Sequence, residues 1–165
     1  MQLSLASTFA PRHSTIAYGV GAGLFAFLGA AGTAGVLAIS LIAFGADLSK
    51  IAIREVADET SFKFAALTLA PCIETFLLSG IIYIVGKVVT QRFAQTLIVA
   101  ILCGAAHGPY PFTFVATSLA FFVYANAYIS WRPQTYLKAY IAAGSAHLVY
   151  NALVVFVSWV LQVGA

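Results

Sequence analysis

Long apolar runs separated by short polar segments are the main pattern of this chain. Four of them cover residues 15–44, 62–86, 112–131 and 139–163, and another begins near residue 93 and ends at the segment HGPYP, residues 107–111. Because a helix needs about 20 apolar residues to cross a membrane, each run is read as one crossing. The pattern therefore predicts an all-α protein, a polytopic transmembrane helix bundle with about five spans.

The runs also suggest how the chain is organised. We expect a single membrane domain over residues 1–165, with an N-terminal anchor span at 15–45 and a four-span core at 62–163. Between them, the polar segment ADLSKIAIREVADETS at 46–61 is expected to form a short helix at the membrane interface. In the anchor span, Gly19 and Gly23 form a GxxxG pair, which suits close contact between helices.

Composition supports a membrane protein and argues against nucleic acid as a partner. Of the 165 residues, 62% are hydrophobic and 8% are charged, whereas soluble domains carry about 25% charged residues. The net charge is +3, but the eight basic residues are spread over short loops and form no basic patch. We therefore expect membrane lipid to surround the protein.

The distribution of basic residues gives an expected orientation. If the chain has five spans, five basic residues lie on the N-terminal side of the membrane: Arg12, Lys87, Arg92, Arg132 and Lys138. Three lie on the opposite side: Lys50, Arg54 and Lys63. Cytoplasmic loops are enriched in Lys and Arg. The excess predicts a multi-pass protein with a cytoplasmic N-terminus.

Glu74 lies in the middle of an apolar run and has no basic residue near it in sequence. Lys63 and Lys87 are eleven and thirteen positions away, which is roughly 16–20 Å along a helix. Ionisable groups inside spans are costly and usually mark function. His107 and His147 are also intramembrane, and Asn151 follows His147 by four residues, on the same helix face.

Each of these polar residues also has a structural explanation, since an intramembrane His often bonds a backbone carbonyl and Asn often joins helices. Three chemistries fit the set. Glu74 and His107 activate water while His147 and Asn151 donate to an oxyanion. Alternatively, Glu74 and the two histidines bind zinc, although HExxH spacing is absent. In the third, His107 and His147 ligate a haem, which gives Glu74 and Asn151 no role.

Three segments resemble motifs of the CPBP family of intramembrane proteases, which includes CAAX prenyl proteases and bacteriocin-processing proteins. The family reads A-P-x-x-E-E-x-x-F-R-G, F-x-x-x-H-G and H-x-x-x-N on successive helices; this chain reads APCIETFLLSG, CGAAHG and HLVYN, over roughly residues 66–155. The resemblance implies that Glu74 activates water, that His107 assists it, and that His147 and Asn151 form the oxyanion site. It implies a glutamic mechanism without a cofactor, although the family was first described as metalloproteases.

The chain departs from the family at three positions. Thr75 replaces the second glutamate, Ser79 replaces the arginine, and Cys103 replaces the phenylalanine of the second motif. Thr75 and Ser79 are four apart on one helix face, so an acid–base pair has been replaced by two hydroxyls that can bond the backbone or each other.

The sequence-based hypothesis is thus an intramembrane endopeptidase acting on a membrane-associated peptide or lipidated protein. An inactive CPBP-like subunit of a membrane protein complex is the first alternative, and a haem-binding membrane protein is the second.

Overall fold

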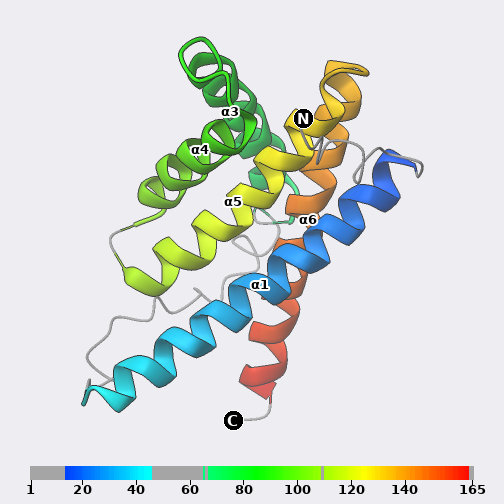
Figure 1. The fold of residues 1–165 in the computed structure, drawn as a ribbon. Coiled ribbons are helices and arrows are strands. Elements are labelled where there is room, and N and C mark those ends of the chain that lie inside the picture. The colour runs from blue at the N-terminus through cyan, green and yellow to red at the C-terminus, as the bar shows by residue number, and fades with distance from the viewer. Residues whose placement is uncertain (1–13, 46–64, 66, 109, 164–165) are drawn as a thin grey trace.

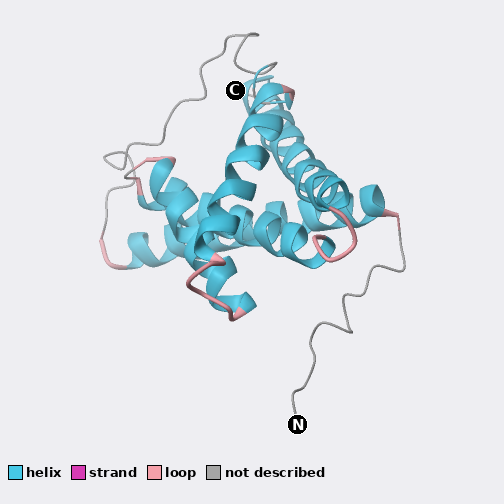
Figure 2. Ribbon diagram, turned by 90° about the horizontal axis from the view of Figure 1, so that it is seen from above, coloured by secondary structure: helices cyan, strands magenta, loops and turns pink. Residues whose placement is uncertain are grey.

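The computed structural model describes residues 14–45, 65, 67–108 and 110–163. They form five helices: α1 (Thr15–Ala43), α3 (Leu69–Val85), α4 (Arg92–Ala106), α5 (Pro111–Trp131) and α6 (Tyr136–Val163). No strand occurs in these ranges, and Figure 2 shows helices joined by loops. The predicted all-α helix bundle is confirmed. The expected interfacial helix at 46–61 lies outside the described residues.

Three of the helices are long and apolar enough to cross a membrane: α1, α5 and residues 136–160 of α6. The other two are apolar but shorter, with 17 residues in α3 and 15 in α4. Pro71 helps to explain where α3 begins, because a proline without an N–H group is tolerated in the first turn of a helix and disfavoured further along it. The expected span from residue 62 begins outside the described residues, and within them α3 runs from Leu69 to Val85.

The outside of the bundle is apolar, as expected of a protein surrounded by lipid. Phe25 and Ile39 on α1 are each 70% exposed, and Phe76 and Ile84 on α3 are 69% and 66% exposed. Apolar surface that is this extensive on a monomer marks contact with a membrane or a partner. Together with the three long helices, it identifies a membrane protein.

Helix α1 packs against α5 and α6, α4 packs on α5, and α3 packs on α6 and α4 (Figure 1). The interior is built from small residues on α6, where Ala139, Ala142, Ala143 and Ala146 are all fully buried. Their spacing of three and four residues places them on one helix face. A face of alanines lets the neighbouring helices approach α6 closely.

The GxxxG pair of α1 packs against α6. A Cβ atom added to Gly19 would lie 2.8 Å from the carbonyl oxygen of Ala142, and one added to Gly23 would lie 2.5 Å from that of Ala146. Any side chain at these two positions would force the helices apart. The predicted close helix contact at this pair is therefore confirmed, and it fixes α1 beside the part of α6 that carries His147.

Hydrogen bonds to main-chain carbonyls hold the shorter helices in place. The Gln95 side chain of α4 donates to the Ile82 carbonyl at the end of α3, at 2.7 Å. Arg92, at the start of α4, donates to the Ile129 carbonyl of α5, also at 2.7 Å. These bonds fix α4 relative to its two neighbours, and hence the position of His107 at its other end.

Candidate functional site

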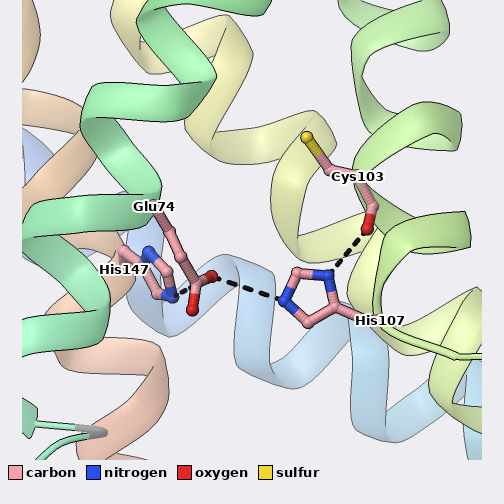
Figure 3. A network of polar contacts seen from close by, with 4 residues as sticks. All are labelled: Glu74, Cys103, His107 and His147. Atoms are coloured by element: carbon pink, nitrogen blue, oxygen red, sulfur yellow. Dashed lines mark hydrogen bonds and ion pairs between the residues drawn. The ribbon is translucent and has the colours of Figure 1, made fainter.

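Glu74 is bound from two sides by histidines of other helices. Its Oε2 atom lies 3.4 Å from Nε2 of His107 and 3.6 Å from Nε2 of His147 (Figure 3). Two residues before it, the Cys72 carbonyl accepts a hydrogen bond from Tyr140 of α6 at 2.5 Å. The acid that has no partner nearby in sequence thus obtains two partners from the tertiary fold.

His107 caps the C-terminus of α4, and its ring is held by the turn that precedes it. Gly108 adopts φ +130°, which ends the helix in a conformation that other residues rarely adopt. Nδ1 of His107 lies 2.7 Å from the carbonyl oxygen of Cys103. Because a carbonyl only accepts, Nδ1 carries a hydrogen and donates it. Nε2 is therefore left to exchange a proton with Glu74.

His147 is held by aromatic side chains of α5. It is 4% exposed, its ring stacks on Tyr124 with centroids 4.7 Å apart, and its edge contacts Phe121 at 5.7 Å. Its Nδ1 atom is buried and has no hydrogen-bond partner among the described residues. A buried N–H group without a partner is rare and costly. We infer that Nδ1 is bare, that Nε2 carries the hydrogen, and that Nε2 points it toward Glu74.

The four residues singled out in the sequence line one cavity of about 480 Å³. Glu74 comes from α3, His107 from the end of α4, and His147 and Asn151 from consecutive turns of α6. The side chains of Glu74 and His107 are 28% and 36% exposed, whereas that of His147 is 5% exposed. A molecule in the cavity therefore reaches the acid and the first imidazole more readily than the second.

The two hydroxyls that replace the family's acid–base pair do not bond each other. Ser79 donates to the carbonyl of Phe76, one turn earlier in its own helix, at 2.7 Å. Thr75 is 1% exposed, and its hydroxyl has no hydrogen-bond partner in the part of the chain that is described. The expectation that both hydroxyls can bond the backbone or each other is therefore met by Ser79 alone. The Thr75 hydroxyl faces α6 near Gly144, which has no polar side chain.

The zinc and haem alternatives would use the same histidines that contact Glu74. Within the described ranges, no three His, Cys, Asp or Glu side chains form a group suited to a metal ion. Both histidines direct Nε2 at the same carboxylate oxygen. Glu74 therefore lies in the space that an iron ion shared by the two rings would need.

Three further residues of the site were not singled out from the sequence. Tyr124 stacks on His147, and Thr113 and Thr117 line the same cavity. They lie on one face of α5 at spacings of four and seven residues, together with Phe121, which contacts the rings of both histidines. This spacing is visible in the sequence, but the face it forms becomes meaningful only once α5 is known to pack beside both histidines.

Comparison of the chain with protein-family models, with curated proteins and with solved structures finds no match. The resemblance to the CPBP family therefore rests on the three sequence motifs alone.

Proposed function

We propose that this protein is a glutamic-type intramembrane endopeptidase related to the CPBP family. One observation carries the proposal: a carboxylate within an apolar helix contacts two imidazoles from other helices, at 3.4 and 3.6 Å, on the wall of a cavity. The substrate class is a membrane-associated peptide or lipidated protein.

The proposed reaction uses the two histidines differently. Glu74 removes a proton from a water molecule, and His107, whose Nδ1–H is fixed on the Cys103 carbonyl, shares that proton. The resulting hydroxide attacks the peptide carbonyl. His147, through Nε2–H, and the Asn151 amide donate hydrogen bonds to the negative oxygen of the tetrahedral intermediate. The proton held by Glu74 and His107 then passes to the leaving amine as the C–N bond breaks.

A multi-pass arrangement with a cytoplasmic N-terminus is part of the same proposal. Helices α3 and α4 lie between α1 and α5 in sequence and form a hairpin of apolar helices. If α3 and α4 each cross the membrane, the chain makes five passes; if neither crosses, it makes three. The number of passes is odd in both cases. The termini then lie on opposite sides of the membrane. With five passes, the excess of basic residues favours the cytoplasm for the N-terminal side.

Peptide cleavage in a reconstituted system tests the proposal. Purified protein in proteoliposomes is incubated with a library of apolar peptides, and new termini are identified by mass spectrometry. We expect the Glu74→Gln variant to fold normally and to cleave nothing. Ser79→Ala is the matched control on the same helix, since the Ser79 hydroxyl bonds only its own backbone, and it should cleave normally.

The alternatives give different results in the same preparation. An inactive membrane-complex subunit would show no cleavage with wild type, and Glu74→Gln would leave its partner complex intact. A haem protein would show a Soret band that His107→Ala removes. Unchanged cleavage by Glu74→Gln would end the proposal.

A further inference from the structure

The cavity extends well beyond the four polar residues, as a groove between α5 and α6. Its α5 wall consists of Thr113, Thr117, Ala120, Phe121 and Tyr124. Its α6 wall consists of His147, Tyr150, Asn151, Val154, Val155 and Ser158. Each wall runs over twelve helical positions, and the eleven rises between its ends correspond to about 16 Å. The groove is therefore much longer than is needed to hold one water molecule and one peptide bond.

Two hydroxyls on the α5 wall differ from most others in the described helices. Helical Ser and Thr side chains commonly donate to a carbonyl three or four residues earlier, and six in these helices do so: Thr33, Ser40, Ser79, Thr96, Ser145 and Ser158. Thr113 and Thr117 do not, and neither has a hydrogen-bond partner among the residues described. Both hydroxyls therefore remain available to a molecule in the groove.

Other unpaired hydroxyls do not have this access. Those of Thr75 and Ser118 also lack partners within the described ranges, but both oxygen atoms are completely buried. Ser118 packs against Gly104 of α4 and Thr75 faces Gly144 of α6. Of these four threonine and serine side chains, only Thr113 and Thr117 combine a free hydroxyl with a position on the cavity wall.

We propose that this groove binds an extended segment of the substrate peptide, with Thr113 and Thr117 hydrogen-bonded to its main chain; the inference rests on the proposed peptidase function. The spacing supports a peptide rather than an acyl chain. Successive turns of α5 place the two threonines about 6 Å apart. Main-chain groups on one edge of an extended peptide recur every second residue, or about 6.6 Å. An acyl chain has no polar group that these hydroxyls would bind.

The opposite wall selects the side chains of this segment. Val154 and Val155 are apolar, and the Ser158 hydroxyl is already used by the Val154 carbonyl, at 2.8 Å. Beyond Asn151 the α6 wall therefore offers apolar surface, while the α5 wall offers hydroxyls. The part from Asn151 to Ser158 is about 10 Å long and holds about three extended residues, so apolar side chains are preferred over about three positions on one side of the cleaved bond.

A binding measurement with the inactive Glu74→Gln variant tests this assignment. The probe is a fluorescein-labelled octapeptide of leucine and alanine, and its anisotropy is followed in nanodiscs with empty nanodiscs as the blank. Adding Thr113→Val and Thr117→Val should raise the Kd about tenfold, since two hydrogen bonds are lost. Thr33→Val is the matched control, because its hydroxyl bonds the Gly29 carbonyl and it lies outside the groove, and it should leave the Kd unchanged.

A second probe identifies the bonded groups. In an octapeptide with ester links in place of alternate amides, the main-chain N–H groups that would donate to the threonine oxygens are missing. It should bind the Glu74→Gln protein more weakly than the parent peptide, and the two threonine substitutions should weaken its binding less. Equal Kd values for the octapeptide with and without the threonines would overturn the assignment. So would tight binding of a fluorescein-labelled fatty acid by a protein that does not bind the octapeptide.

The outcomes separate this inference from the proposed function. If Glu74→Gln abolishes cleavage and the threonine variants bind and cleave like wild type, the groove assignment alone is wrong. If wild type cleaves no peptide but the threonine substitutions still weaken peptide binding, the groove assignment holds and the peptidase proposal is wrong.

Discussion

Oε2 of Glu74 lies 3.4 Å from Nε2 of His107, although the two residues are 33 positions apart and lie on different helices. The orientation of the imidazole is set by its other nitrogen, which donates to the Cys103 carbonyl. Such a bond from the far side of a ring fixes both its direction and its tautomer. The pair can therefore hold one proton on either partner, which is the property a general base and its assistant require.

Replacing His107 tests this pairing. His107→Gln retains a polar side chain but cannot share a proton with Glu74, so kcat should fall by about 10²- to 10⁴-fold, the usual contribution of general acid–base catalysis. Steady-state cleavage of a peptide in proteoliposomes measures it. Cys103→Ala is the control: His107 is held by the main chain of Cys103, so removing the sulfur should leave kcat within about twofold. A large loss with Cys103→Ala would indicate that the thiol takes part.

His147 and Asn151 are proposed to act on the transition state, so their loss should lower kcat more than it raises KM. His147→Ala and Asn151→Ala should each lower kcat by about 10²- to 10³-fold, as for the loss of one oxyanion donor. A rise in KM at constant kcat would mean that these residues only bind substrate.

Tyr124 positions His147 through its ring rather than through its hydroxyl. The ring stacks on the imidazole at 4.7 Å, and the hydroxyl is buried without a hydrogen-bond partner in the described part of the chain. Tyr124→Phe should keep kcat and leave thermal stability equal or higher, because an unsatisfied buried hydroxyl is removed. Tyr124→Leu should lower kcat and cost about 0.5–1.5 kcal/mol or more through the lost ring pair. Equal loss in both variants would assign the role to the hydroxyl.

Gly23 holds α1 against the segment of α6 that contains His147. Gly23→Leu should cost at least about 1–3 kcal/mol, because the new side chain collides with the Ala146 carbonyl. Gly29→Leu is the matched control on the same helix, where an added Cβ meets no atom within 4 Å. Thermal unfolding in detergent should show a lower Tm for the first variant alone. Similar Tm values would show that α1 does not pack closely at this point.

Much of this arrangement could be predicted from the sequence, because charged and polar residues in apolar helices are few and must find one another. The pattern predicted the convergence of Glu74, His107, His147 and Asn151 on one cavity. It could not predict the role of Tyr124, because a tyrosine in an apolar helix looks the same in sequence whether it faces lipid or stacks on the His147 ring.

Chain topology also limited what the glycines could reveal. Gly19 and Gly23 contact α6, whereas Gly29, Gly32 and Gly35 have no atom within 4 Å of an added Cβ. All five have similar apolar neighbours in sequence. Their different roles depend on where α1 leaves the bundle, and no local pattern contains that information.

Glu74, together with His107, is proposed to activate water without a metal ion. The most direct test is the rate of peptide cleavage by protein that has been stripped with 1,10-phenanthroline and EDTA, compared with the Glu74→Gln variant. Stripped wild type should retain its full rate, and Glu74→Gln should have no detectable activity. Loss of activity on chelation with recovery on adding zinc, or cleavage by Glu74→Gln at the wild-type rate, would contradict it.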